Sequence, residues 1–371
     1  MGKAPLQQEE DERRIWARSQ EEQRRLEASG HLYDDPELEA YIARVLERVR
    51  PPEVSRGDLS LRVRVIKNPL LNAFTYPNGA IYVHTGILAR IDNEAQLATL
   101  LAHELAHASH RHAVTRFRDI QNKTAFISTF QVMAAPWGLI GLVAQALGTV
   151  GAIAAIYGHS QEQELEADRE GLRLMTRAGY DPREAPKLFL HLRQWIEDEK
   201  KPEPFFFGTH PRLAERTASY ESLLAGEFRG AAAQGGEVGG PEFLARTRRA
   251  LLDNAVLDLQ AGRFVQTQKT ISKYLALDPH DAAAHYYLGE SHRRSNDPQQ
   301  REQALAHYRE AIGRAAGFPE PYRGLGTLHY QAGNRTEARR AFAEYLRLAP
   351  GAKDRPYIEG LLEELGEDDK S

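Results

Sequence analysis

Residues 91–117 read IDNEAQLATLLAHELAHASHRHAVTRF, and the pentad HELAH within this stretch occupies residues 103–107. Residues four apart on an α-helix lie on one face, roughly 5–6 Å apart at Cβ. The imidazoles of His103 and His107 can therefore bind one zinc ion, and Glu104 can reach a water molecule on the same ion. The alternative is a solvated helix face on which the pentad occurs by chance.

The residues around the pentad predict a helix with an apolar back. Apolar side chains recur there at helical spacing, at Leu97, Leu100, Leu101, Leu105 and Ala108. We expect Asp92 to cap this helix and Glu94 to lie in its first turn. His110 and His112 follow closely, but their spacing does not continue the face of the pentad. We therefore expect both at the surface and neither on the metal.

A second predicted helix spans residues 161–178, which read QEQELEADREGLRLMTRA, and we expect it to end at Gly179. Glu164 and Asp168 are four residues apart and share a face. One carboxylate can bind zinc while the other holds a ligating imidazole by its second nitrogen. Glu166 points to another side of the helix. The alternative is an ordinary charged helix with no role at a metal.

Four motifs occur in the order typical of one family of enzymes. They are NAFTYPNGAIYVHTGIL at 72–88, HELAH at 103–107, ELEAD at 164–168 and Thr209-His210-Pro211. Over about residues 35–225 the chain resembles metallopeptidase family 48, the gluzincins that include the HtpX-like and CAAX-prenyl-protease-like enzymes. The resemblance implies an α+β zincin-like domain that is mostly helical with a small sheet, and a zinc metalloendopeptidase activity.

The resemblance also implies roles for individual residues. One Zn²⁺ per chain would be held by His103, His107 and Glu164, with Asp168 behind a ligand. Glu104 would be the general base, taking a proton from water and passing it to the leaving amine. His210 matches a family histidine close to the metal, as a transient ligand or as a donor to the transition state. Alternatives are a capping role for His210, and Arg212 or Arg216 as the donor to the oxyanion.

Three short segments before the pentad predict a sheet. LRVRVIK at 61–67 alternates apolar and charged residues, and NAFTYP at 72–77 and AIYVHTG at 80–86 flank a turn at Pro77-Asn78-Gly79. An edge strand beside the metal helix can pair with an extended peptide through main-chain hydrogen bonds. We assign that substrate strand to Ala80, Ile81, Tyr82, Val83 and His84. The alternative is a plain structural sheet.

Residues 124–160 contain no Asp, Glu, Lys or Arg. A single membrane span is incompatible with the metal assignment, because His107 before it and Glu164 after it must reach one ion. Two spans would need roughly 40 apolar residues plus a turn. We therefore expect an apolar hairpin that covers the active site as a lid or makes peripheral contact with a membrane surface. We also expect His210 or residues 158–163 to obstruct the metal at rest.

Composition describes a globular protein of two or three domains, with 371 residues, 42% apolar residues and a net charge of −4. This charge, without a long basic patch, gives no case for nucleic acid as a partner. The chain has no cysteine, so it has neither disulfides nor thiolate ligands. Its start, MGKAPLQQEEDERR, shows no signal sequence. Residues 1–34 are expected to form a charged, peripheral helix, and a helix over 36–50 is expected to begin after Asp35.

Residues 226–241 carry six glycines and predict a flexible linker that ends the metallopeptidase domain at 225. Beyond it the chain repeats with a period near 34 residues, which matches the tetratricopeptide pattern of two helices per unit. The expected units are 248–281, 282–318 and 319–352 within a domain over 242–371, followed by a capping helix at 354–366. Such stacks present a concave surface for peptides or proteins.

Together these features resemble exported bacterial members of the family that join the protease to tetratricopeptide repeats. That resemblance implies a periplasmic or other envelope location, protein or unfolded-polypeptide substrates, and a link to outer-membrane assembly through the repeats. A cytoplasmic location is the alternative. A repeat-based chaperone or adaptor with a latent zinc site is the main rival function. A membrane-bound prenyl-protein protease is disfavoured because the multiple spans are missing.

Overall fold

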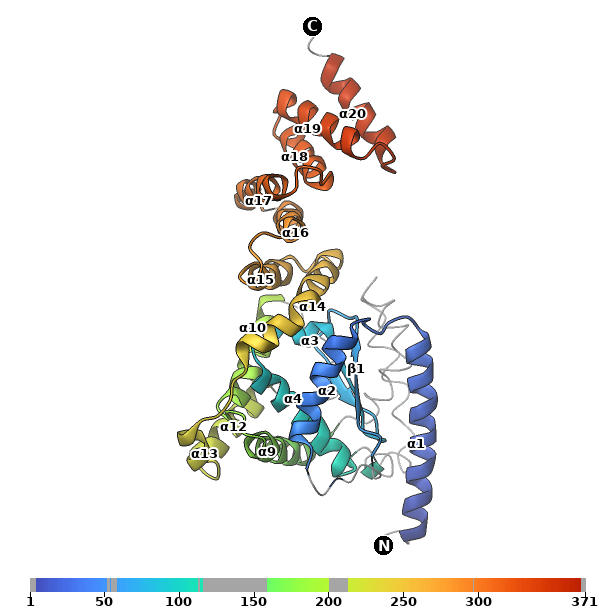
Figure 1. Ribbon diagram of the computed structural model, residues 1–371, viewed down its shortest axis with the longest axis vertical. Helices are drawn as coiled ribbons and strands as arrows, with labels where there is room; N and C mark the ends of the chain where they lie inside the picture. Colours follow the sequence, from blue (N-terminus) through green and yellow to red (C-terminus); the bar gives the residue numbers. More distant parts are fainter. Residues whose placement is uncertain are drawn as a thin grey trace. The chain divides into compact units, whose positions relative to one another are not determined.

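The computed structural model describes residues 5–51, 54, 59–112, 114–115, 159–199, 213–295 and 297–367. The chain divides into two compact units, with the boundary between Ala250 and Leu251. The described elements are helices and one three-stranded sheet, so the predicted fold class is confirmed (Figure 1). No helix within these ranges is both long enough and apolar enough to cross a bilayer. His210 and all but the last two residues of the apolar segment 124–160 lie outside the described residues.

The sheet has the strand order β1-β3-β2. Strand β1 (Arg62–Ile66) runs parallel to β3 (Ala80–His84), and β2 (Ala73–Thr75) pairs with β3 in an antiparallel hairpin. Gly79 at the hairpin turn has a φ of 90°, a value that favours glycine. The assignment of β3 as the substrate strand is therefore wrong. Both of its edges already pair with neighbouring strands, and the edge on the side of the hairpin belongs to β2.

Helices cover both faces of the sheet, as Figure 1 shows. On one face lie α2 (Pro36–Val49) and α4 (Glu94–Ser109), which share a core with alternate strand residues Val63, Val65, Ala73, Ile81 and Val83. On the other face lies α1 (Pro5–Ala28), where Glu27 accepts a hydrogen bond from the Tyr82 hydroxyl and pairs with Arg62. Successive side chains of a strand point to opposite faces of the sheet, so one set packs against α2 and α4 and the other set faces α1.

The start of α4 differs from the prediction by one residue. Asn93 is the N-cap, and its side chain accepts a hydrogen bond from the Gln96 amide. Asp92 instead contacts His191, at 3.1 Å, on α10 (Glu184–Glu199). Both residue types can cap a helix. The chain that follows the short helix α3 (Thr85–Arg90) places Asn93, and not Asp92, at the capping position.

Helix α9 (Gln161–Arg177) packs directly against α4. It begins with a capping box, in which Ser160 and Gln163 each accept a hydrogen bond from the other's backbone amide. Gly171 lies where α9 meets α4, and a Cβ atom there would come within 3.0 Å of the His103 amide nitrogen. The close approach of the two backbones therefore requires glycine at this position. Helix α12 (Leu213–Ala225) packs against both α9 and α10.

The prediction of a flexible linker over residues 226–241 is wrong for most of that range. The segment contains helix α13 (Arg229–Gln234), and Phe228 before that helix is buried in the core of the first unit. The Glu237 backbone exchanges hydrogen bonds with Gly179 and Asp181, and the Val238 carbonyl accepts one from Ala95. Gly236 allows the backbone of this segment to pack closely against the first unit, since a Cβ on Gly236 would lie 2.6 Å from the backbone of Tyr180.

Helix α14 (Gly240–Gln260) contains the boundary between the two units. The second unit continues as helices joined by short turns: α15 (Phe264–Leu275), α16 (Ala282–Arg294), η1 (Pro298–Gln300), α17 (Arg301–Arg314), α18 (Glu320–Gln331), α19 (Arg335–Leu348) and α20 (Arg355–Glu367). Aromatic rings pack against glycines where these helices meet. Cβ atoms on Gly289 and Gly324 would both lie within 3 Å of the Tyr308 ring.

Candidate metal centre

The side chains of His103, His107 and Glu164 converge where α4 meets α9. The two Nε2 atoms are 3.0 Å apart, and the Glu164 carboxylate oxygens lie 3.5 Å from His103 Nε2 and 3.4 Å from His107 Nε2. All three side chains are buried. Two nitrogens and a carboxylate at such separations form a donor set suited to one zinc ion.

His103 is oriented from behind by Asp168, four residues after Glu164 on α9. Asp168 Oδ1 lies 3.0 Å from His103 Nδ1, and it also accepts a hydrogen bond from the Tyr220 hydroxyl at 2.9 Å. Burial alone would raise the pKa of Asp168, but the charge of Arg216 and the hydrogen bond with His103 outweigh burial and lower this pKa. Asp168 is thus a carboxylate placed to accept a hydrogen bond from His103 Nδ1, a nitrogen that also lies 3.0 Å from Arg216 Nη2. A proton on Nδ1 would leave Nε2 to bind a metal.

Arg216 on α12 lies at the centre of this group. Its guanidinium forms a bidentate pair with Asp168, lies 3.6 Å from Glu164 Oε2, and stacks 4.1 Å from the centroid of the Phe189 ring. Burial would lower the pKa of Arg216, but the charges of Asp168 and Glu164 raise it above its ordinary value. Arg216 is therefore a permanent positive charge held next to the metal ligands.

The charges of the centre fit a divalent cation. The structure describes three buried carboxylates here, those of Glu104, Glu164 and Asp168. Among the described side chains, Arg216 is a buried cation that contacts two of them, Glu164 and Asp168. With neutral histidines, three negative charges and one positive charge give a formal charge of −2. Burying an excess of two negative charges without a counterion costs free energy, because buried charges lose their hydration. The donor set and its charge together fit zinc.

Glu104, next to His103 on α4, contacts the edge of the sheet. Its side chain is buried, and Oε2 accepts a hydrogen bond of 2.7 Å from the Thr75 hydroxyl at the end of β2. The Thr75 hydroxyl also lies 3.3 Å from the Glu104 carbonyl oxygen. The edge strand nearest the predicted base is therefore β2. Sequence reasoning missed Thr75 because strand order cannot be read from the alternation of side chains.

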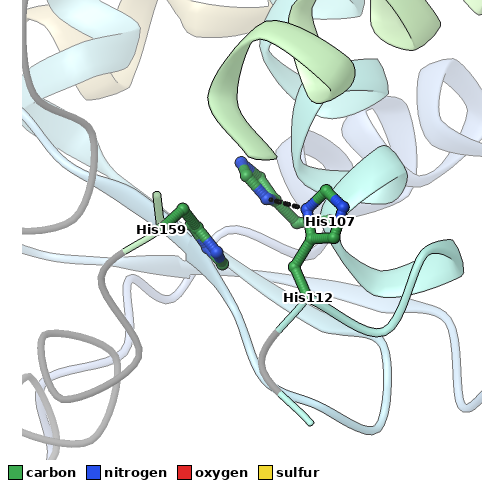
Figure 2. A group of neighbouring side chains, drawn as sticks. All are labelled: His107, His112 and His159. Carbon is green, nitrogen blue, oxygen red and sulfur yellow. Dashed lines mark hydrogen bonds between the residues drawn. The ribbon is translucent and has the colours of Figure 1, made fainter. Parts of the chain in front are cut away.

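A second set of histidines lies on the opposite side of His107. His107 Nδ1 is 2.8 Å from His112 Nδ1, and the His159 ring stacks on the His107 ring with centroids 3.6 Å apart. Figure 2 shows these three imidazoles and the hydrogen bond between His107 and His112. His112 Nε2 in turn lies 3.2 Å from Glu166 Oε2. Burial lowers the pKa of His112 despite the opposing effect of Glu166.

The prediction of a surface position is wrong for His112, whereas His110 is exposed as expected. The prediction extended helical spacing beyond residue 109, where α4 ends. Arg111 then adopts a positive φ of 55°, and this turn brings His112 back to His107. His159 was missed because it precedes α9 and approaches His107 only through the tertiary fold. The other residues near the pentad that sequence reasoning missed are Thr75 and Tyr220.

A cavity of about 550 Å³ opens beside Glu164, between α9 and α12. Its lining mixes carboxylate, amide, hydroxyl and apolar groups, from Gln161, Leu165, Glu215, Ala218 and Ser219 besides the residues of the centre. The structure therefore brings His103, His107, Glu164 and Asp168 together, and it places Glu104 on the same helix as the two histidines with its carboxylate on Thr75. It says nothing of His210 or Arg212, which lie outside the described residues.

Comparison with known proteins places this centre within a family. The sequence profile of peptidase family M48 matches residues 36–223, about half of the chain, and a tetratricopeptide repeat profile matches residues 299–353. The resemblance inferred from the four motifs and the repeats is thus confirmed. The residues that form the metal centre all lie within the first match, and part of the second unit lies within the second.

Named relatives include bacterial and mitochondrial proteases. The chain is similar to the beta-barrel assembly-enhancing protease of Escherichia coli (strain K12), with 26% identity over 294 residues, 70% of this chain and 59% of that protein. The corresponding protein of Yersinia pestis is 31% identical over 51% of this chain and 39% of its own length. The mitochondrial metalloendopeptidase OMA1 of Schizosaccharomyces pombe is 32% identical over 50% and 52%. The chain thus spans less than two thirds of each of these relatives.

Proposed function

Because the chain belongs to peptidase family M48, we propose that it is a zinc-dependent endopeptidase with His103, His107 and Glu164 as metal ligands and Glu104 as general base. The observation that carries this proposal is the convergence of His103, His107 and Glu164 from two helices that are more than 50 residues apart in sequence. The buried charge of the centre supports a divalent ion.

A bound zinc ion would supply a Lewis acid that polarises the scissile carbonyl and lowers the pKa of water to about 7. The protein's own groups then complete the reaction. Glu104 takes the proton of the attacking water and delivers it to the leaving amine, while Thr75 holds its carboxylate in place. Asp168 keeps His103 in the ligating tautomer. Arg216 supplies a fixed positive charge close to where negative charge develops on the substrate.

The substrate peptide binds in extended form along the outer edge of β2 in this proposal. β2 pairs with β3 along one edge, and its last residue, Thr75, contacts the predicted base. Main-chain hydrogen bonds to a strand edge hold a peptide without regard to its side chains. The cavity beside Glu164 can then receive a substrate side chain.

The second part of the proposal is that the chain acts on proteins of a bacterial envelope, with the repeats recruiting the substrate or an assembly partner. It rests on the relatives named for β-barrel assembly and on the helical repeats of the second unit. The rival proposal is a repeat-based chaperone or adaptor in which the zinc site is latent. The carboxylate of Glu104, which is buried and held by the Thr75 hydroxyl one residue after His103, favours an active enzyme.

Paired variants test the chemistry. Glu104→Gln removes the proton acceptor without removing a ligand, so zinc should remain while peptide cleavage falls by about 10²–10⁴. The matched variant His103→Ala/His107→Ala should lose both zinc and activity. Zinc content by elemental analysis and turnover of an unfolded protein substrate check both. Unchanged cleavage by Glu104→Gln, or full zinc retention by the double variant, would contradict the proposal.

A further inference from the structure

His107 makes directional contacts through both of its ring nitrogens. Nε2 faces the centre, 3.0 Å from His103 Nε2 and 3.4 Å from Glu164 Oε1. Nδ1 faces the opposite way, 2.8 Å from His112 Nδ1. A metal ligand bound through Nε2 carries its proton on Nδ1, so His107 donates this bond and His112 Nδ1 accepts it. The His112 proton must then lie on Nε2, which is 3.2 Å from Glu166 Oε2.

We propose that His112, oriented by Glu166, is the positioning residue that fixes the ring and tautomer of the metal ligand His107. This inference rests on the proposed zinc site. A histidine that ligates a metal usually donates its second N–H to a group that fixes its orientation. Asp168 does this for His103, and the His112–Glu166 pair does it for His107. Both carboxylates come from α9, which therefore orients both histidines of α4.

The surroundings of His112 suit this role and those of its neighbour do not. His112 is 3% exposed, so water competes little for its hydrogen bonds. His110, two residues earlier, has 36% of its side chain exposed and approaches Glu166 only to 3.8 Å. Ring nitrogens of His107, His112 and His159 lie within 4.8 Å of one another and could be taken as a second metal site. That reading is disfavoured because Nδ1 of a zinc-bound His107 carries a proton.

The stacking of His159 also argues against a second ion. Its ring lies nearly parallel to that of His107, with 15° between the ring planes. Lone pairs of imidazole nitrogens lie in the ring planes, so those of two stacked rings run side by side and do not converge on one ion. Stacking instead restricts rotation of the His107 ring, in the same sense as its hydrogen bond to His112.

Zinc affinity, measured by competition with a chromophoric chelator, tests the proposal without reference to peptidase activity. His112→Leu removes the acceptor and should weaken zinc binding 10–100-fold. His112→Asn places an amide oxygen where Nδ1 lies and should restore most of that loss. His110→Asn is the matched control and should bind zinc as the wild type does. Glu166→Gln should weaken binding less than His112→Leu, and combining the two should add nothing further.

The outcomes separate this proposal from its rivals. If His112→Leu binds zinc with wild-type affinity, the proposal is overturned. It is also overturned if His112→Leu and His112→Asn weaken zinc binding equally and lower the melting temperature of the metal-free protein by matching amounts. A zinc stoichiometry that falls from two to one in His112→Leu, with the first ion bound as before, would show a second metal site instead. If zinc binds as expected but no peptide is cleaved, the proposed function fails while this inference stands.

Discussion

At the residue scale, the burial of His84 at the end of β3 should make the free energy of unfolding depend on pH. Its side chain is buried, Nδ1 contacts the Leu70 carbonyl oxygen at 3.3 Å, and burial lowers the pKa of His84 to about 4. The unfolded chain binds a proton near the ordinary pKa of about 6.5. Between these two values the unfolded state binds more protons, so the free energy of unfolding should fall as pH falls.

The expected slope from His84 approaches about 1.4 kcal/mol per pH unit between pH 6 and 4.5, and its contribution is fully present above pH 7. Other groups titrate over the same range, so the comparison is between wild type and His84→Gln, which stays neutral. Urea unfolding at several pH values should show a shallower pH dependence in the variant. Identical slopes in the two proteins would contradict this linkage.

The residues of the candidate site differ in how far sequence could predict them. The pairing of His103 with His107 depends only on helix geometry, which is local. Glu164 and Asp168 followed from a second helix together with the family resemblance. Arg216 entered only as an alternative, because its contacts with Asp168 and Glu164 join residues that are about 50 positions apart in sequence and lie on different helices. His112 was misplaced because a turn, and not the helix, carries it back to His107.

At the element scale, α14 shows the consequence of mistaking a packed segment for a linker. Phe243 in its first turns is fully buried in the core of the first unit. A chain ending at residue 241 loses this ring, whereas one ending at Gln260 keeps it. Because burial of a phenylalanine stabilises a core by about 3–5 kcal/mol, the shorter chain should be less stable by at least that amount.

Urea unfolding of the two truncated chains, followed by circular dichroism, measures this difference. Within residues 1–260, Phe243→Ala should account for most of it. The control Leu190→Ala, at a side chain that is 36% exposed, should cost well under 1–2 kcal/mol. Equal stability of the chains ending at 241 and 260 would show that α14 adds nothing to the first unit.

Elements themselves were easier to predict than their pairing. Strands β1, β2 and β3 all fall within predicted segments, because alternation and turn residues are local signals. Their order was not predicted. It depends on a parallel pairing between β1 and β3, which are separated by β2 and the hairpin turn. That pairing makes β3 central and leaves β2 as the strand beside Glu104.

At the scale of the whole molecule, we assign peptide cleavage to the first unit and recruitment of substrates to the second. The candidate ligands, the proposed base and Arg216 all lie before Ala250, and the tetratricopeptide match lies after it. A chain of residues 1–260 should therefore cleave a short peptide as fast as the full chain does. It should cleave a large unfolded protein more slowly, because it lacks the repeats to which we assign the recruitment of such substrates.

Steady-state kinetics on both substrate classes check this prediction, with kcat/KM as the quantity compared. A loss confined to the protein substrate supports recruitment by the second unit. Equal losses on both substrates would mean that the second unit supports the catalytic centre itself. No loss on either would remove the repeats from substrate binding and leave scaffolding as their role.

The glycine at the crossing of α4 and α9 has a consequence for the choice of ion. With no side chain on Gly171, the backbone that carries Glu164 is held against the backbone of His103. The spacing of the two helices behind the candidate ligands is then set by main-chain contact. The donors that this spacing brings together then favour zinc, because zinc binds imidazole nitrogens whereas calcium takes oxygen ligands. The absence of a single methyl group at residue 171 thus allows two imidazoles from α4 and a carboxylate from α9 to lie within reach of one ion.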